Sequence, residues 1–359
     1  MFIRCVVSIL LAAVTMTVRG AETQPANSAM IRVDGRVWND LPEDSSSDES
    51  SAVTQTAAYP AVRWLINVEG SRLSIDARCN TPNNSVDVIV DGGKPRRVPL
   101  AVGQHETELW SGAVGRHQIE VHKRNEAWQG IITISRWHTD GQFLDPPPPA
   151  GRRLLFIGDS ITSGSGIDAV RDDPTNDASL VSNGRLTYAR QLAERLDADA
   201  HLVAYGGRGL VRDWQNVRDT NNAPIFYDRT LPDDAGKPWD PSRFIPDAVS
   251  ICLGTNDFNH GIPQRREWVD AMTTLIQTIR TDFPNVPVIL ITSPMQPPET
   301  PERNALRDYL KEIAGGLQHV HVAQIGHYPG RTVDSHPIAE EHQRIADELE
   351  PVLRRVLGW

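Results

Sequence analysis

Residues 154–161 read LLFIGDSI, four apolar residues followed by Gly158, Asp159, Ser160 and Ile161. The pattern is typical of a buried strand that ends in a turn and presents a serine at the carboxyl edge of a sheet, where open α/β sheets hold their ligands. Taken alone, it also fits a turn followed by a helix cap. Three more segments favour a shared site: YGGRG at 205–209, LGTND at 253–257 and DSHP at 334–337.

The second half of the chain alternates continuous apolar runs with segments of helical spacing. A parallel sheet buried on both faces has this pattern, because helices cover each side. We therefore expect an α/β domain over 152–359. The apolar runs are 154–158, 200–204, 248–253 and 286–292, and the helical segments are 185–196, 265–283, 300–317 and 338–357.

The first half instead contains short runs in which apolar and polar residues alternate, separated by Gly, Pro and Asn. This predicts an all-β sandwich over 30–144. The segment 145–151, DPPPPAG, favours an extended connector between the two domains. The alternating runs are 62–68, 72–77, 86–90, 118–122 and 130–134.

The first twenty residues have the pattern of a secretory signal peptide: Arg4 near the start, an apolar run, and small residues at Gly20 and Ala21. We therefore predict a secreted or periplasmic protein. The apolar run is shorter than the roughly 20 residues that span a bilayer, so the mature form should not insert into a membrane. Beyond the signal, Cys79 and Cys252 should be two separate buried thiols.

The net charge of −10 provides no basic surface, so a nucleic-acid partner is not expected. A neutral substrate fits this balance better than a polyanion. The sequence holds no cysteine cluster and no His-Glu-x-x-His motif, and its GGRG run lacks the Lys-Ser/Thr ending of a phosphate-binding loop. We therefore predict neither a metal nor a cofactor.

Ser160 needs a base within hydrogen-bond reach, because a serine hydroxyl is a weak nucleophile at its own pKa. His336 is the best candidate among the histidines, since it lies in a short loop before a predicted helix. Asp334 lies close enough to orient its imidazole. The same segment also fits a helix-initiating turn with Pro337 at the first helical position.

Donors for a tetrahedral oxyanion are also available after the predicted strands. Glycines at 206, 207 and 209 allow backbone N–H groups to approach a ligand closely. The side-chain amide of Asn256 offers another neutral donor. Each of these positions also fits ordinary turn chemistry at the end of a strand.

Together these segments resemble the four sequence blocks of the SGNH, or GDSL-type, hydrolases. More narrowly, the chain resembles the two-domain carbohydrate esterases of family two, which are acetyl esterases acting on plant polysaccharides. The resemblance runs from about residue 33 to residue 357 and includes RNEAWQG at 124–130 and YDRTLP at 227–232. It implies a jelly-roll sandwich followed by a flavodoxin-like, three-layer α/β/α hydrolase domain.

The resemblance also implies roles for single residues. Ser160 would be the nucleophile, His336 the base and then the acid, and Asp334 the residue that orients His336. The backbone N–H groups of Ser160 and Gly209, with the Asn256 amide, would form the oxyanion hole. Gly207 is the alternative to Gly209 and a predicted part of the substrate site. The general pattern has two residues between Asp and His, whereas only one intervenes here, which is similar to family two.

Trp214 and Trp239 lie in a long loop rich in Asn, Asp and Pro, from 213 to 246. Loops of that length are usually functional, so we expect these tryptophans to wall a cleft for sugar rings, although core packing is the alternative. The expected activity is removal of O-acetyl groups from carbohydrates such as xylan through an acetyl-serine intermediate. A lipase or thioesterase, or a polysaccharide-binding module without catalysis, are the alternatives.

Overall fold

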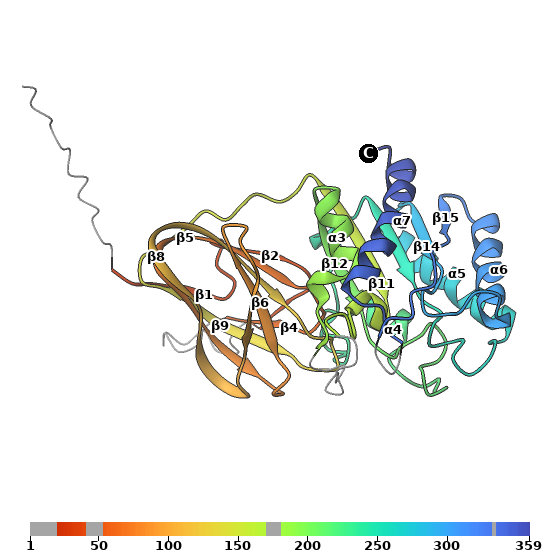
Figure 1. Cartoon of the computed structure of the whole chain (residues 1–359), viewed down its shortest axis with the longest axis horizontal. Helices are drawn as coiled ribbons and strands as arrows, with labels where there is room; N and C mark the ends of the chain where they lie inside the picture. Colours follow the sequence, from red (N-terminus) through yellow and green to blue (C-terminus); the bar gives the residue numbers. More distant parts are fainter. Residues whose placement is uncertain (1–19, 41–52, 170–180, 332–334) are drawn as a thin grey trace, which may run out of the picture.

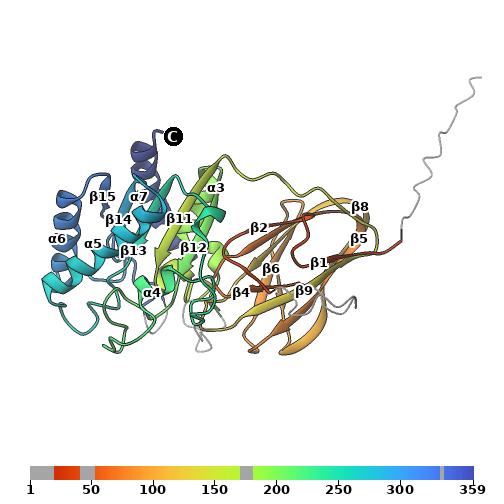
Figure 2. The same cartoon turned by 180° about the vertical axis from the view of Figure 1, so that it is seen from behind.

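The computed structural model describes residues 20–40, 53–169, 181–331 and 335–359. Its strands form two separate sheets, which belong to two units that lie side by side (Figures 1 and 2). Residues 145–151 connect the units and have no regular secondary structure. The predicted signal peptide at 1–20 lies almost entirely outside the described residues. Within them, no helix has the length and apolar character needed to cross a membrane.

The first unit is an antiparallel β-sandwich of ten strands, as predicted. Its strand order is β3-β4-β9-β5-β8-β6-β7, with β1 on β9 and with β2 and β10 on β5. Trp64 and Trp137 meet in its core, with ring centroids 6.3 Å apart. The strands are β1 (Glu22–Pro25), β2 (Ile31–Asp34), β3 (Trp38–Asp40), β4 (Thr54–Ala57), β5 (Arg63–Cys79), β6 (Ser85–Val90), β7 (Arg96–Pro99), β8 (Gly103–Lys123), β9 (Ile132–Thr139) and β10 (Gln142–Leu144).

Strand β5 corrects one expectation, because it joins the runs 62–68 and 72–77 that the sequence suggested were separate strands. The Gly70–Arg72 segment is a register shift in a continuous strand rather than a turn. The Asp140 carboxylate holds this irregularity by accepting the N–H groups of Ser71 and Arg72 at 2.7 and 3.0 Å. β5 can therefore pair with β2 and β10 before the shift and with β9 after it.

The second unit has a five-stranded parallel sheet in the order β12-β11-β13-β14-β15, which is the flavodoxin-like order. The predicted fold class is confirmed. In such a sheet the strand order reverses between the first and third strands, here β11 and β13, and ligands bind at the carboxyl ends of the strands there. The strands are β11 (Arg152–Gly158), β12 (Ala198–Ala204), β13 (Ala248–Cys252), β14 (Val288–Ile291) and β15 (Val320–Ala323).

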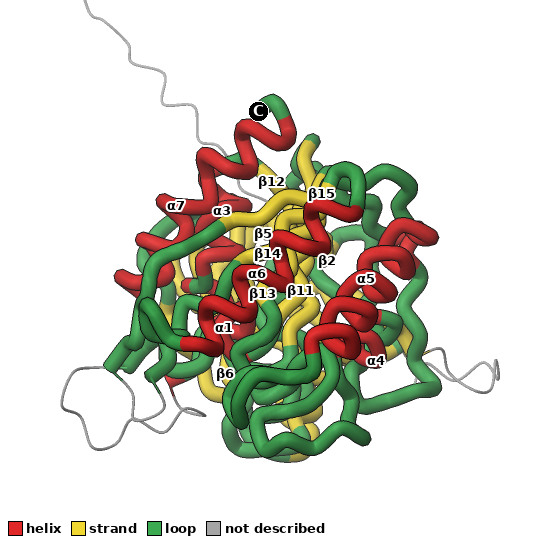
Figure 3. The backbone as a smooth tube through the Cα atoms, turned by 90° about the vertical axis from the view of Figure 1, so that its right-hand side faces the viewer, coloured by secondary structure: helices red, strands yellow, loops and turns green. Residues whose placement is uncertain are grey.

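Helices cover both faces of this sheet, and α3 and α7 lie opposite α5 when the unit is viewed from its end (Figure 3). Alternate residues of β11 explain this: Leu154 and Phe156 pack with α3 and α7, whereas Leu155 and Ile157 pack in the cluster that contains α4, α5 and α6. The helices are α1 (Ser160–Ser163), α3 (Tyr188–Arg195), α4 (Ala223–Tyr227), α5 (Arg265–Asp282), α6 (Pro301–Gly316) and α7 (Ala339–Leu357), with 3-10 turns η1 (Gly184–Leu186) and η2 (Pro241–Arg243).

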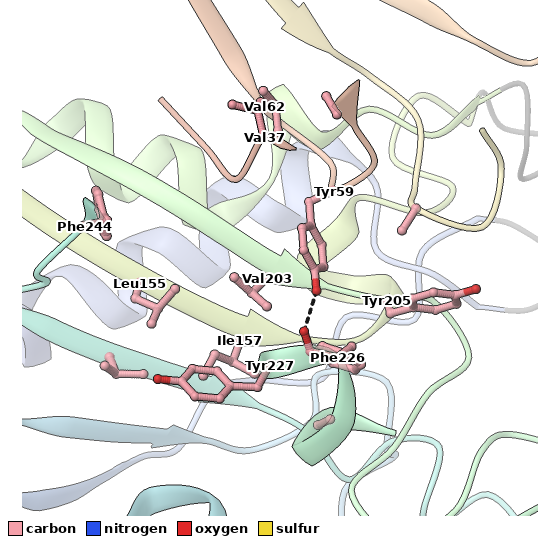
Figure 4. Close-up of a cluster of buried hydrophobic side chains, with 14 of the residues drawn as sticks. Val37, Tyr59, Val62, Leu155, Ile157, Val203, Tyr205, Phe226, Tyr227 and Phe244 are labelled. Atoms are coloured by element: carbon pink, nitrogen blue, oxygen red, sulfur yellow. Dashed lines mark hydrogen bonds between the residues drawn. The ribbon is translucent and has the colours of Figure 1, made fainter. Parts of the chain in front are cut away.

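The two units share one hydrophobic core rather than touching only at a polar surface. Tyr59 of the sandwich is fully buried and donates its hydroxyl hydrogen to the Phe226 carbonyl of α4 at 2.6 Å (Figure 4). Asp34 of β2 accepts from Arg190 of α3 at 2.9 Å, and both side chains are buried. Burial alone would raise the pKa of Asp34, but Arg190 and Arg63 hold it at about 2. The sandwich is thus fixed on the sheet that carries the site.

Candidate active site

A cavity of about 640 Å³ opens at the carboxyl edge of the parallel sheet. The turns after β11, β12 and β13 all reach it, as expected for the point where the strand order reverses. Ser160, Gly207, Asn256 and His336, which come from four separate segments, line this one cavity. The structure therefore brings together most of the predicted site.

Ser160 directly follows the short turn between β11 and α1. Asp159 caps the helix by accepting the Ile161 N–H at 3.0 Å, and Ser160 is the first helical residue. A side chain on Gly158 would overlap Thr162, so glycine is required for this close turn. As the first residue of the helix, Ser160 has a backbone N–H without an acceptor inside the helix.

His336 lies next to Ser160, as the sequence predicts. Its Nε2 atom is 2.8 Å from the Ser160 Oγ atom, a normal hydrogen-bond distance. Gly330, with φ of +64°, packs closely against the His336 carbonyl and leaves no room for a side chain. Asp334 lies outside the described residues, so its orienting role stays a prediction.

The glycine turn places Gly207, rather than Gly209, at the cavity. The Gly209 N–H already donates to the Asn222 side chain at 3.3 Å, and Gly209 does not line the cavity. The reason is Asp257, whose buried carboxylate accepts the next three backbone N–H groups, at 210–212, and turns this stretch inward. Gly207, the alternative, lines the cavity with φ of +76°, a conformation that favours glycine.

Asn256 follows β13 and faces the same cavity. Its amide donates one hydrogen to the Arg208 carbonyl at 2.8 Å, and an asparagine amide has two such hydrogens. Its neighbour Asp257 is fully buried, and burial raises the pKa of that carboxyl group against the effect of its backbone donors. The two neighbours therefore have different roles: Asn256 faces the cavity, and Asp257 holds the backbone of the glycine turn.

The two predicted tryptophans have different positions. Trp214 lines the cavity with 53% of its surface exposed, and its backbone N–H donates to the Gly207 carbonyl at 2.9 Å. Trp239 does not reach the cavity, which corrects its assignment to the substrate site. The guanidinium groups of Arg36 and Arg243 instead lie over its ring, 4.7 and 4.9 Å from the ring centroid. Core and cation–π packing, the alternative for such a residue, describes Trp239.

The sequence reasoning missed the contribution of the sandwich to the site. Trp128, in the loop 124–130 after β8, lines the cavity and is 50% exposed. Glu126 of the same loop is fully buried and accepts a hydrogen bond from the Ser165 hydroxyl, and Ser165 also lines the cavity. In the sequence, only the RNEAWQG segment, which is part of the family resemblance, indicated this contribution. Periodicity cannot show that a loop of the sandwich meets the edge of a distant sheet.

The charges around the cavity are largely balanced. Arg208 pairs with Asp213 at 3.3 Å, and both residues line the cavity. Burial raises the pKa of Asp159 to about 7 and lowers the pKa of His342, behind His336, to about 3. No group of three His, Cys, Asp or Glu side chains suited to a metal ion occurs among the described residues. This setting suits proton transfer on a neutral ligand.

Comparisons with known proteins agree with this architecture. Residues 156–350 match the GDSL-like lipase/acylhydrolase family, and residues 47–148 match the carbohydrate esterase 2 N-terminal domain. An acetylxylan esterase/glucomannan deacetylase of Cellvibrio japonicus is 35% identical over 309 residues, 85% of each chain.

Two solved structures have the same fold over nearly their whole length. A family two carbohydrate esterase from Cellvibrio japonicus has a TM-score of 0.86 and 32% identity, covering 95% of this chain and 99% of that one. A family two carbohydrate esterase from Clostridium thermocellum, in complex with cellohexaose, has a TM-score of 0.81 and 27% identity, covering 92% and 99%. The sandwich and the α/β unit therefore occur together in these relatives.

Proposed function

The chain belongs to the GDSL-like lipase/acylhydrolase family and to the family two carbohydrate esterases, and on this basis we propose that it removes O-acetyl groups from polysaccharides such as xylan or glucomannan. Membership makes it a carboxylic ester hydrolase. The observation that carries the proposal is the 2.8 Å contact between Ser160 Oγ and His336 Nε2 at the cavity.

The first half of the proposed reaction acylates Ser160. His336 Nε2 takes the hydroxyl proton while Oγ attacks the acetyl carbonyl carbon. The resulting oxyanion is stabilised by the N–H groups of Ser160 and Gly207 and by the Asn256 amide, three residues that line the cavity. The bond between the acetyl carbonyl carbon and the sugar oxygen then breaks, and the leaving sugar oxygen receives the proton from His336.

The second half releases acetate. A water molecule gives its proton to His336 Nε2 and attacks the acetyl-serine carbonyl, and collapse of the second tetrahedral intermediate returns the proton to Ser160 Oγ. Asp334 would orient the imidazole in both halves, as the resemblance implies. No metal or cofactor is part of this proposal.

A polysaccharide substrate is supported by the surface around the cavity. Trp128 and Trp214 each expose about half of their surface there, and aromatic faces suit the apolar faces of sugar rings. The Arg208–Asp213 pair cancels its own charge, which favours a neutral glycan. The Clostridium thermocellum relative was solved with cellohexaose, a chain of neutral sugars, which agrees with this assignment.

We predict that Ser160→Ala abolishes hydrolysis of a chromogenic acetate ester while the fold is retained, because it removes the hydroxyl whose Oγ atom lies 2.8 Å from His336 Nε2. Ser163→Ala, one turn further along α1, is the matched control and should keep its activity. Turnover that survives in Ser160→Ala would contradict the nucleophile, and a wild type without turnover would favour the binding-module alternative. A preference for acyl chains beyond about four carbons would favour the lipase alternative.

We also propose that the protein is exported as a secreted or periplasmic enzyme. The basis is the signal-like pattern of residues 1–20, and polymeric glycans lie outside the cell membrane. Mass spectrometry of the mature amino terminus tests this proposal, because cleavage near Gly20 or Ala21 is expected.

A further inference from the structure

Glu126 is a buried carboxylate that the sandwich places directly behind the active-site cavity. Its side chain has no exposed surface, which is rare for glutamate and costly unless the charge is compensated. The loop that carries it is rigidly held: Arg124 pairs with the buried Asp87, and the Glu126 N–H donates to the Gln129 side chain at 3.0 Å. The carboxylate is therefore held in one position by the sandwich.

Two of the turns around the cavity contact the Glu126 carboxylate. Its Oε1 atom accepts the hydrogen of the Ser165 hydroxyl, and the Ser165 N–H donates to the Ser160 carbonyl at 3.0 Å. Its Oε2 atom lies against Gly206, so closely that a side chain on Gly206 would overlap it. Glu126 thus joins the turn that carries Ser160 to the turn that carries Gly207.

The groups around Glu126 oppose the effect of burial on the pKa of its carboxyl group. Burial raises the pKa of its carboxyl group, and the Ser165 hydroxyl, the His336 imidazole, the Trp128 indole and the Lys123 ammonium act in the opposite direction. Burial lowers the pKa of Lys123 itself to about 7, and its ammonium donates to the Asn125 carbonyl at 2.7 Å.

The groups that face His336 come from several elements. Asp159, the cap of α1, and Glu126 of the sandwich loop interact with it as carboxyl groups, and His342 of α7 interacts with it as a second imidazole. The low pKa of His342 leaves this ring neutral near pH 7. Two buried carboxyl groups and a neutral imidazole therefore interact with His336.

We propose that Glu126 is a positioning residue of the esterase reaction, which holds the Ser160 turn against the glycine turn and keeps a negative charge near His336 as that imidazole takes the serine proton. The inference rests on the esterase function proposed above. It assigns the sandwich a part in turnover through a residue that does not itself touch the reacting atoms.

Glu126→Gln tests both parts of the role with one change of similar shape. Loss of the charge should lower kcat about 10- to 100-fold with KM changed less than about threefold, because the imidazolium of the transition state loses a balancing charge. It should also move the acid limb of kcat/KM to lower pH, because an imidazole without a nearby carboxylate is easier to deprotonate. A purely structural role would leave the acid limb in place. Wild-type kcat with an unmoved acid limb would overturn the proposal.

Ser165→Ala keeps the proposal testable if Glu126→Gln does not fold. It removes the hydroxyl that links Glu126 to the Ser160 turn but keeps the carboxyl group, so kcat should fall several-fold. Wild-type kcat in this variant would overturn the positioning role. Glu108→Gln, on the exposed surface of β8, is the matched control and should behave as the wild type.

The same assays distinguish this inference from the function on which it rests. A wild type that does not hydrolyse the chromogenic acetate ester contradicts the proposed esterase. A wild type that does, with a Glu126→Gln variant of equal kcat and equal acid limb, overturns only the role of Glu126.

Discussion

His201, in the middle of β12, is a buried histidine at the contact between the two units. Its ring stacks on Phe244 with centroids 3.7 Å apart and meets Trp239 edge-on at 5.6 Å. Burial lowers its pKa from the ordinary 6.5 to about 3. Between those values the unfolded chain binds a proton that the folded chain does not, so this residue removes stability as the pH falls through that window.

We predict that His201→Phe loses less stability on acidification than the wild type. Between pH 6.5 and pH 5 the difference should be about 1.5 kcal/mol, measured as the free energy of unfolding in urea. The comparison with His201→Phe is needed to isolate the effect of His201 on the free energy of unfolding. Asp159, with its pKa raised to about 7, binds a proton in the folded state and adds stability as the pH falls. His105→Gln, on the exposed surface, is the control, and parallel pH profiles for wild type and His201→Phe would contradict the assignment.

The positions of single residues in the site were the feature that the sequence predicted least completely. Ser160, His336 and Asn256 could be recognised as candidate site residues because each follows a strand or precedes a helix. The choice between Gly207 and Gly209 could not be made, because it depends on which N–H groups the Asp257 carboxylate takes up. Trp239 was misplaced for a related reason, since a loop position does not show which way an indole points.

At the level of elements, the turns around the cavity depend on glycines that have different surroundings from glycines elsewhere. Gly206 lies against Glu126, whereas Gly315 lies in α6 with nothing within 4 Å of the position that a side chain would take. The same substitution should therefore have opposite effects at the two sites.

We predict that Gly206→Ala lowers turnover at least tenfold, because the added carbon overlaps a carboxylate that cannot move away. Gly315→Ala should instead stabilise the protein by about 0.5–1 kcal/mol, since alanine favours the helix and restricts the unfolded chain. Acetate-ester kinetics and urea unfolding of both variants test the pair. An active Gly206→Ala enzyme would show that the turn has room to adjust.

Most elements of the α/β unit could be predicted because their apolar periodicity is strong. The helix expected at 265–283 is α5, and that expected at 300–317 is α6, where Thr300 caps the first turn by accepting the Arg303 N–H at 3.3 Å. The run 286–292 was too long, since only Val288–Ile291 form β14. In the sandwich, Gly70 resembled a turn, and only the long-range contact with Asp140 shows that the strand continues.

For the whole molecule, the decisive feature is the buried ion pair between the units. Arg190 of α3 and Asp34 of β2 are both nearly inaccessible, and Arg63 also reaches Asp34 at 2.9 Å. Removing one partner of such a pair leaves a buried charge without full compensation, which is more costly than losing a surface pair.

We predict that Arg190→Met lowers the free energy of unfolding by about 3 kcal/mol and that both units still unfold in one transition. The shared core around Tyr59 makes separate unfolding unfavourable, so tryptophan fluorescence and loss of esterase activity should have the same urea midpoint. Arg266→Met, which is solvent-exposed on α5, serves as the control. Two separated transitions in the wild type would contradict this coupling.

Sequence reasoning could define the two units but not their contact. The alternating and continuous apolar patterns identify a sandwich and an α/β unit, because each pattern reflects packing within one unit. Glu126 and Trp128 act across the contact, where residues far apart in the chain meet without any repeating pattern. The contribution of the sandwich to the site therefore becomes visible only in three dimensions.

The core that both units share also limits how genes of this kind can recombine. A crossover that exchanged the first half for an unrelated module would expose the apolar surface around Leu155 and Val203 to water, and would separate Glu126 from the glycine beside it. Such a hybrid would be both unstable and slow. The two halves should therefore be inherited as a matched pair, and additional modules should be tolerated at the chain ends rather than between the units.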